Sequence, residues 1–341
     1  MLYKGGFSEG TDANDADLVD RIARSFQSSS DIHEGPSDSF WNSIVAQNKS
    51  DVAGYLLTNR LDDAARLLRD PASTNFFYGF EHLVLEFALA LERRGEQGIA
   101  EQSGLLYSML TRTAAALGLV RVANPEASAA PSSLSTDELI AAIEESVGTK
   151  ISFPNPFPRE FGLVSTRGVI SYRAIQSLYQ AIVLKRFAAE FDAPSVIEIG
   201  GGLGRAAYYA HVFGLRDYTL IDLPTTGVAQ AYFLGRTLGD ETISLQGEPA
   251  RGLNIRIPEW LPSATKVDVV INVDSLTEMA RPTADGYVQW AKKNARLLIS
   301  INHEANPFTA HEVMRDAGLI SSREPYWLRD GYVLEVARLQ T

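Results

Sequence analysis

The stretch that decides the fold is Val196-Ile197-Glu198-Ile199-Gly200-Gly201-Gly202-Leu203-Gly204, a short apolar run that leads directly into glycines. Arg205–Val212 follows with the apolar spacing of a helix. Glycine lets the backbone turn sharply, and it lets a ligand approach the main chain without a side chain in the way. A strand, a glycine turn and a helix in this order predict one unit of an open α/β sheet, with a ligand site at the carboxyl end of the strand.

An acidic residue ends the next expected strand. Tyr218–Ile221 leads into Asp222, 20 residues beyond Gly202, and a carboxylate at this place can accept hydrogen bonds from both hydroxyls of a ribose. The run from Gly202 to Ala207 also fits the dinucleotide pattern G-x-G-x-x-A, so an NAD-dependent oxidoreductase is one alternative. Glu198 argues against NAD, because a carboxylate beside the pocket suits a cationic ligand and repels a pyrophosphate.

Strands and helices alternate from Ser195 to the end of the chain, which predicts parallel βαβ units with right-handed crossovers. Arg329-Asp330-Gly331 separates two extended segments and predicts a hairpin, whose antiparallel strand also speaks against an NAD-binding sheet. We therefore predict an α/β fold, a Rossmann-like sheet of seven strands with a C-terminal antiparallel hairpin. The further strands are expected at Thr242–Leu245, Val267–Ile271, Leu297–Ile301, Ile320–Trp327 and Gly331–Val336, and the further helices at Gly227–Leu238, Ala284–Lys293 and Ala310–Ala317.

The first half of the chain is expected to be all-helical. Ser135-Thr136-Asp137-Glu138 matches a capping box and predicts the start of a helix that runs through Glu145. The stretch from Ala123 to Ser133 is small, polar and proline-containing, which is typical of a loop. Residues 151–168 include FPNPFPREFG, whose prolines predict an extended loop, either a linker packed by its own aromatics or a lid on the substrate side. Ser171–Phe191 then predicts a long amphipathic helix.

Composition limits the classes of function. The chain has 341 residues, 45% of them hydrophobic, which excludes a mostly disordered protein. A net charge of −11 opposes attraction to phosphate backbones, so we expect no nucleic-acid partner. The absence of cysteine excludes disulfides, thiolate metal sites and a cysteine nucleophile. No apolar run approaches the roughly 20 residues that cross a bilayer, so we expect a cytoplasmic protein with no membrane span.

Three motifs together resemble a known family. E-x-G-x-G-x-G at 198–204, the acid that ends the second strand and the terminal hairpin resemble the class I S-adenosylmethionine-dependent methyltransferases. More narrowly, EIGGGLGR at 198–205, YTLIDLP at 218–224 and INVDSLTEM at 271–279 resemble bacterial sugar O-methyltransferases of surface-polysaccharide pathways. The resemblance divides the chain into a helical N-terminal cap region (1–150), an aromatic loop with a connecting helix (151–194), and an S-adenosylmethionine-binding domain (195–341).

The resemblance implies a cofactor site. In that family the acid and the glycines of the first turn line the methionine portion of the cofactor, and the acid of the second strand holds the ribose. Gln246 stands where the family often has an acid that reads the adenine amino group, and an amide oxygen can accept the same hydrogen bond. The implied cofactor-binding residues are Glu198, Gly200, Gly201, Gly202, Asp222, Leu223, Gln246 and Asn272.

Polar residues end the fourth and fifth strands, where methyl transfer to a hydroxyl would take place. Such a transfer is an in-line displacement, so the enzyme must align the hydroxyl oxygen, the methyl carbon and the sulfur. It must also remove the hydroxyl proton, and a general base typically accelerates such a reaction ~10²–10⁴-fold. His303 is the candidate base, because the ordinary pKa of histidine suits neutral pH, unless it is a loop residue bonded to the backbone. Asp274 is the competing base or the group that orients the acceptor, unless it caps a helix. Glu278 is expected to bind substrate or to be structural.

The helix before the sheet domain opens with two further candidates. Tyr172 is expected to stack on the substrate and Arg173 to meet a carboxylate or phosphate on it, unless both pack an interdomain surface. Asp274, Glu278, His303 and Glu304 could together bind a divalent cation through oxygen and nitrogen. We do not favour this alternative, because the sequence has no compact ligand motif such as H-x-x-x-H.

The sequence thus favours an S-adenosylmethionine-dependent O-methyltransferase acting on a sugar or glycoconjugate hydroxyl. The alternatives are a small-molecule natural-product O-methyltransferase, the NAD-dependent oxidoreductase, and a non-catalytic binding module with the same fold. The expected partner is a small-molecule or glycan acceptor. The sequence is also compatible with a homodimer.

Overall fold

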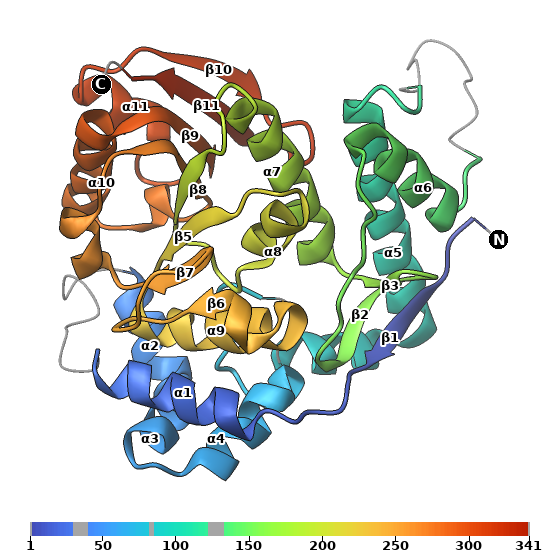
Figure 1. The fold of residues 1–341 in the computed structure, drawn as a ribbon. Coiled ribbons are helices and arrows are strands. Elements are labelled where there is room, and N and C mark those ends of the chain that lie inside the picture. Colours follow the sequence, from blue (N-terminus) through green and yellow to red (C-terminus); the bar gives the residue numbers. More distant parts are fainter. Residues whose placement is uncertain (1, 30–39, 82–84, 122–132, 340–341) are drawn as a thin grey trace.

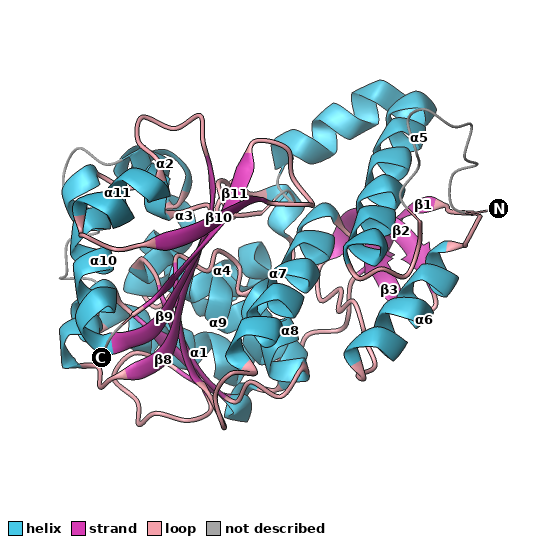
Figure 2. Cartoon of the chain, turned by 90° about the horizontal axis from the view of Figure 1, so that it is seen from above, coloured by secondary structure: helices cyan, strands magenta, loops and turns pink. Residues whose placement is uncertain are grey.

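The computed structural model describes residues 2–29, 40–81, 85–121 and 133–339 (Figure 1). A large sheet with helices on both faces forms one part of the molecule. A smaller part beside it contains α5 (Leu85–Ala116), α6 (Thr136–Val147) and a three-stranded sheet (Figure 2). The loop expected from Ala123 to Ser133 lies, apart from its last residue, outside the described residues.

The large sheet has the mixed topology that the alternating elements predict. Its strands are β4 (Ser195–Ile199), β5 (Asp217–Ile221), β6 (Ile243–Ser244), β7 (Leu253–Arg256), β8 (Val267–Val273), β9 (Ala295–His303), β10 (Ser321–Pro325) and β11 (Tyr332–Arg338). They lie in the order β10-β11-β9-β8-β4-β5-β7-β6, and β11 runs antiparallel to both neighbours while the other pairs are parallel. The predicted α/β fold with a C-terminal antiparallel hairpin is therefore confirmed.

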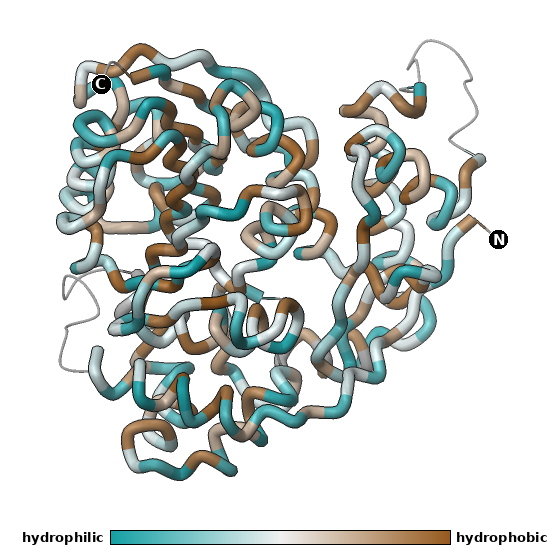
Figure 3. Tube along the Cα trace, in the orientation of Figure 1, coloured by the Kyte–Doolittle hydropathy of each residue, from teal (hydrophilic) through white to brown (hydrophobic). Residues whose placement is uncertain are grey.

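Helices cover both faces of this sheet. α7 (Tyr172–Ala188), α8 (Arg205–Val212) and α9 (Pro224–Leu238) share one apolar core with the N-terminal helices. α10 (Arg281–Asn294) and α11 (Ala310–Asp316) pack in a second core. Because successive strand residues point to opposite faces, Val196 lies in the first core and Ile197 in the second. Hydrophobic residues gather accordingly along the strands (Figure 3).

The sheet has one strand more than predicted. The additional strand is β7, which lies between β5 and β6. Of the strand expected at Thr242–Leu245, only the two residues of β6 form a strand. All four residues of β7, Leu-Asn-Ile-Arg, are buried. Arg256 donates hydrogen bonds to the carbonyl oxygens of Ser244 at 2.9 Å and Leu245 at 2.6 Å. The alternation Leu-Asn-Ile-Arg spans only four residues, which is the shortest run that indicates a strand, so a pattern-based prediction easily misses it.

The N-terminal region is mainly helical, as predicted, but it is not all-helical. β1 (Gly5–Glu9) pairs antiparallel with β2 (Pro158–Ser165), which pairs antiparallel with β3 (Gly168–Ile170). The extended loop expected over 151–168 is therefore a strand in its second part. Pro158 opens this strand, a position that tolerates proline. The other N-terminal helices are α1 (Ala16–Gln27), α2 (Phe40–Asn48), α3 (Ser50–Leu57) and α4 (Leu61–Arg69).

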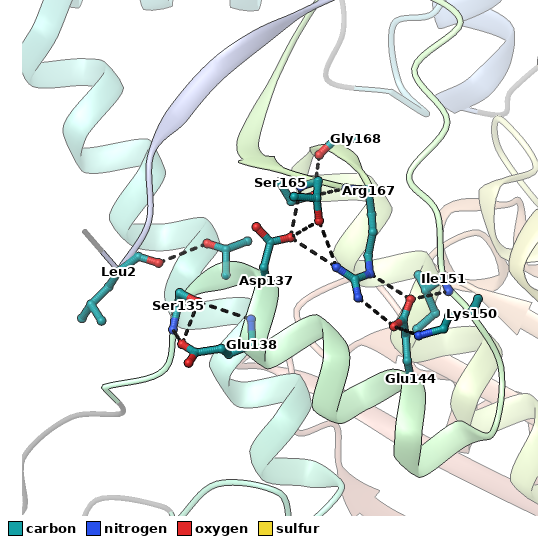
Figure 4. Close-up of polar contacts among 12 residues, drawn as sticks. Leu2, Ser135, Asp137, Glu138, Glu144, Lys150, Ile151, Ser165, Arg167 and Gly168 are labelled. Atoms are coloured by element: carbon teal, nitrogen blue, oxygen red, sulfur yellow. Dashed lines mark hydrogen bonds and ion pairs between the residues drawn. The ribbon is translucent and has the colours of Figure 1, made fainter.

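A capping box begins α6, as predicted (Figure 4). The Ser135 amide donates to Glu138 Oε2 at 2.7 Å, and the Glu138 amide donates to Ser135 Oγ at 3.3 Å. Arg167, in the turn between β2 and β3, donates to both carboxylate oxygens of Glu144 at 2.9 Å. This hydrogen-bonded pair lowers the pKa of Glu144 to about 2 and ties the small sheet to α6.

Candidate functional site

The turn between β4 and α8 has a backbone that favours glycine. Gly200, Gly202 and Gly204 have φ angles of 74°, 57° and 86°, a region that side chains avoid. A Cβ on Gly200 would lie 2.1 Å from Ser275 Oγ, and one on Gly202 would lie 3.2 Å from the Cβ of Phe80. The glycine turn is thus enclosed by the residues after β8 on one side and by the N-terminal region on the other.

Asp222, at the end of β5, lies against this turn. Its carboxylate accepts hydrogen bonds from the Gly202 amide at 3.2 Å, the Leu223 amide at 2.9 Å and Gln230 Nε2 at 2.8 Å. Burial nevertheless raises the pKa of Asp222 to about 7. The acid and the glycines that the sequence paired at a distance of 20 residues are therefore hydrogen-bonded neighbours.

An apolar pocket opens beside Asp222. Leu223 and Gln246 line it, and α1 contributes Ile22 and Phe26 to its wall. Few polar side chains face this space, which suits a flat aromatic base. We refer to it as the apolar pocket.

A second cavity lies along the glycine turn and is lined by Gly200, Gly201 and Gly202. Three acids, Glu198, Asp274 and Glu278, and three arginines, Arg173, Arg205 and Arg329, also line it. We refer to it, after its buried Glu198, as the acidic cavity. Glu198 is buried and accepts a hydrogen bond from the Tyr218 hydroxyl at 2.7 Å. Burial, reinforced by the nearby Asp222, raises the pKa of Glu198 to about 7. A cation bound in this cavity would favour the ionised form of Glu198.

Asp274 follows β8 with a φ of 63°, which is strained for a residue with a side chain. Its Oδ2 accepts a hydrogen bond from Arg329 at 2.6 Å and lies 3.6 Å from Arg173. Both arginines also line the acidic cavity. The two cations neutralise Asp274, and the surrounding structure holds its strained backbone.

A third space, an open cleft between α5 and the loops after β9 and β10, shares lining residues with the acidic cavity. Tyr172 and His303 both line this open cleft. His303 Nδ1 accepts a hydrogen bond from the Ala305 amide at 3.1 Å. Its ring meets Tyr332 edge-on, with the ring centroids 5.0 Å apart.

Glu278 lines both the acidic cavity and the open cleft. It ends a short 3-10 helix, Leu276–Glu278, directly after β8. Burial, reinforced by the negative charge of Asp274, raises the pKa of Glu278 to about 7, although Trp41 donates a hydrogen bond to it and Arg173 and Arg329 attract it.

Asn272 is the one expected site residue that lines none of these three spaces. Its Nδ2 donates to the Ile199 carbonyl at 2.8 Å, and its Oδ1 accepts from the Leu276 amide at 3.0 Å and from Asn302 Nδ2 at 2.8 Å. These bonds occupy the amide in joining β4, β8 and β9, so the structure does not place Asn272 beside a ligand.

Sequence reasoning missed several residues of the site. Arg329 was read only as part of a hairpin turn, and Tyr332 only as part of a strand, yet both line the acidic cavity and the open cleft. Ile22 lies in α1 and Phe80 in a turn before α5, and the apolar residues of both segments indicate only a core. An arginine at a hairpin turn beside the carboxyl ends of the strands was the single available signal.

Among the described residues, no group of three or more histidine, aspartate or glutamate side chains is arranged to hold a metal ion. Glu304, considered for such a site, pairs with Arg323 at 2.7 Å. Within the same part of the chain, no helix is long and apolar enough to span a bilayer.

No family model matches the chain, and no curated protein matches its sequence. Among solved structures, the CcbJ methyltransferase from Streptomyces caelestis matches 49% of this chain and 90% of its own at 10% identity, with a TM-score of 0.40. The glycopeptide N-methyltransferase MtfA, complexed with sinefungin, matches 48% and 94% at 12% identity, with a TM-score of 0.38. The cyclase SpnF matches 48% and 80% at 14% identity, with a TM-score of 0.38.

The strand order, with a central glycine turn and an antiparallel C-terminal hairpin, defines a methyltransferase-like α/β fold. Such a fold hosts many activities, so any activity must be argued from the side chains that line the cavities.

Proposed function

We propose that the chain is an S-adenosylmethionine-dependent O-methyltransferase that transfers a methyl group to a hydroxyl of a sugar or glycoconjugate. The observation that carries this proposal is the acidic cavity beside the glycine turn. Its buried Glu198 suits the ammonium group of an amino-acid ligand, which would draw the carboxyl into its charged form. A pyrophosphate beside Glu198 would meet repulsion, which disfavours NAD, because the arginines of this cavity are already paired with Asp274, Glu81 and Glu160.

The described residues fit the parts of this cofactor in order. The apolar pocket, with Leu223 and Gln246, suits the adenine, and Asp222 suits the ribose hydroxyls. A carboxylate has about four lone-pair sites, so Asp222 can keep contacts with its protein partners while accepting from a ligand. Glu198 suits the methionine ammonium group. When bound, S-adenosylmethionine supplies an electrophilic methyl group on a sulfonium.

The residues of the chain would then align the acceptor, exclude water and accept a proton. The N-terminal region supplies the cover, since Phe80 packs on the glycine turn and α1 walls the apolar pocket. The contacts of Asp274 with two arginines and the hydrogen bond from the Ala305 amide to His303 hold both side chains in place, which supports a role for them in orienting an acceptor.

The open cleft supports a polyhydroxylated acceptor. Tyr172 and Tyr332 offer aromatic surface on which a sugar ring can pack, and Ser108, Arg112 and Asn306 offer polar groups to hydroxyls. A small natural product is the alternative acceptor for the same reaction. The absence of cysteine supports a reducing, cytoplasmic compartment for this enzyme.

Calorimetric titration with S-adenosylhomocysteine and, separately, with NAD tests the cofactor. We expect S-adenosylhomocysteine alone to bind, with a Kd of roughly micromolar order. Asp222→Ala should weaken that binding about tenfold or more, because a charged hydrogen-bond acceptor is lost. Asp217→Ala, at the opposite, exposed end of the same strand, is the matched control and should leave the Kd unchanged.

Other outcomes of the titration favour the other classes. Binding of NAD alone would replace the methyltransferase with an oxidoreductase, and binding of neither ligand would favour a non-catalytic module. If S-adenosylhomocysteine binds, incubation of the protein with S-adenosylmethionine and panels of sugar nucleotides, glycans and small natural products, followed by mass spectrometry for an added methyl group, distinguishes the acceptor classes.

A further inference from the structure

The acidic cavity and the open cleft meet at a shared wall. Three residues line both spaces: Glu278, Arg329 and Tyr332. If the cofactor ends in the acidic cavity and the acceptor enters through the open cleft, the methyl group must cross where these three side chains stand. Any group that takes the hydroxyl proton must reach the same point.

Hydrogen bonds from the protein already engage the two other candidate bases. His303 Nδ1 accepts a hydrogen bond from the Ala305 amide, so a neutral ring carries its proton on Nε2 and offers no acceptor there. Nε2 also lies close to Gly331, where an added Cβ would come within 2.9 Å. Asp274 Oδ2 accepts a hydrogen bond from Arg329 at 2.6 Å and lies 3.6 Å from Arg173, so two arginines already engage this oxygen.

The two other residues of the shared wall are poorer proton acceptors at neutral pH. Arg329 is a guanidinium that stays protonated. Tyr332 is a phenol whose pKa is raised by burial, and Arg329 donates a hydrogen bond to its oxygen. Glu278 is the one carboxyl among the three.

The groups around Glu278 leave its charge balanced between two states. Burial and Asp274 favour the protonated carboxyl, whereas Trp41, Arg173 and Arg329 favour the carboxylate, and the pKa of Glu278 settles at about 7. A base with a pKa near the working pH combines a large ionised fraction with useful proton affinity.

We propose that Glu278 is the general base of the methyl transfer, an inference that rests on the proposed function. The acceptor O–H bond breaks and its proton passes to a Glu278 carboxylate oxygen. The new O–CH₃ bond forms as the CH₃–S bond breaks, and the electron pair of that bond stays on sulfur as S-adenosylhomocysteine.

This position has a consequence for binding that needs no acceptor. An ionised Glu278 at the crossing point attracts the positive sulfonium of S-adenosylmethionine and has no such charge to attract in S-adenosylhomocysteine. The ratio of the two affinities therefore reports the charge of Glu278. Changes at Glu198 and Asp222 affect both ligands through groups that the ligands share, so these changes largely cancel in the ratio.

The test is calorimetric titration of wild type, Glu278→Gln and Glu304→Gln with both ligands at pH 6 and pH 8. We expect the wild type to favour S-adenosylmethionine over S-adenosylhomocysteine more strongly at pH 8 than at pH 6. In Glu278→Gln this preference should be about tenfold smaller at pH 8, and it should no longer change with pH. Glu304→Gln, the matched control in the next strand-end loop, should behave as wild type, because Glu304 pairs with Arg323 outside both spaces.

A wild-type ratio that is flat between pH 6 and pH 8 would overturn the inference without any variant. So would a Glu278→Gln protein that binds both ligands with the wild-type ratio, while the proposed function would stand. If the wild type binds neither ligand, the proposed function itself fails.

Discussion

Three carboxyl groups around the glycine turn and the strand ends share one property at the scale of the residue. Glu198, Asp222 and Glu278 each have a pKa raised to about 7, and burial is the largest cause for each. Buried carboxyls destabilise the folded chain at neutral pH, and clusters of such groups in a cavity are typical of functional sites. The local sequence showed that acids stand here, but their burial depends on segments that pack over them from elsewhere in the chain.

Glu198→Gln should stabilise the ligand-free protein at high pH. The folded-state pKa of about 7 exceeds the ordinary 4.5, so the folded chain keeps a proton that the unfolded chain loses as the pH rises between these values. This carboxyl therefore lowers stability across that window. At pH 8 the variant should gain about 2–3 kcal/mol in the free energy of unfolding, and near pH 4 it should gain little. Urea unfolding at both pH values measures the difference.

The same variant should bind S-adenosylhomocysteine more weakly, because the ammonium group loses its acid. A gain in stability that is equal at pH 4 and pH 8 would contradict the raised pKa. Tyr218→Phe removes a hydrogen bond that favours the ionised Glu198, so the pKa of Glu198 should rise further and the loss of stability should continue to a higher pH than in the wild type.

Helix and strand ends were predictable where a short-range signal sets them. The capping box at Ser135 and the glycine turn after β4 involve residues within a few positions of one another, and both form as predicted. β1 and β7 were not predictable, because each is a short strand held by a partner far away in the chain. The hairpin of β2 and β3 was hidden by prolines that end where its first strand begins.

Glu144→Gln should loosen the attachment of this hairpin to α6. The pKa of Glu144 is lowered to about 2 by Arg167, so the stabilisation is complete above pH 4.5 and is lost as the pH falls toward 2. We expect the free energy of unfolding of the variant to be about 2–3 kcal/mol lower than that of the wild type at pH 7. This gap between the two proteins should narrow below pH 4.5. Urea unfolding between pH 3 and pH 7 measures this gap.

Lys150→Met is the matched control for that experiment. Lys150 also contacts Glu144, at 3.0 Å, but its side chain is 89% exposed, and exposed pairs contribute little. A gap that does not change with pH would mean that Glu144 stabilises the attachment by packing and not by charge.

At the scale of the whole molecule, one buried cation joins three parts of the chain. Arg205, the first residue of α8, donates to Glu81 Oε2 at 2.7 Å and to Glu160 Oε1 at 2.7 Å, and all three side chains are buried. Glu81 follows Phe80, which packs on the glycine turn, and Glu160 lies in β2. This cluster therefore anchors the N-terminal region and the small sheet at the start of the helix that follows the glycine turn.

Arg205→Met should be strongly destabilising, by about 3–5 kcal/mol, because it leaves two buried carboxyls without their cation. The loss should be greater at pH 8 than at pH 5, since burial and Glu81 already raise the pKa of Glu160 and removing the arginine raises it further. Adding Glu81→Gln and Glu160→Gln to the variant should restore much of the stability in urea unfolding. Arg338→Met, which breaks an exposed pair with Glu190, is the control and should change little.

The sequence by itself determined the class of fold, and twelve of the thirteen site residues that it named line one of the three spaces. A strand, a glycine turn and an acid 20 residues later are local patterns, and backbone sterics and strand periodicity are enough to interpret them. Tertiary structure alone decided that Arg329 and Tyr332 reach the same wall as Glu278 and that Asn272 is occupied within the sheet. It also decided that Phe80 covers the glycine turn. These placements depend on contacts between residues far apart in the chain, which no local pattern encodes.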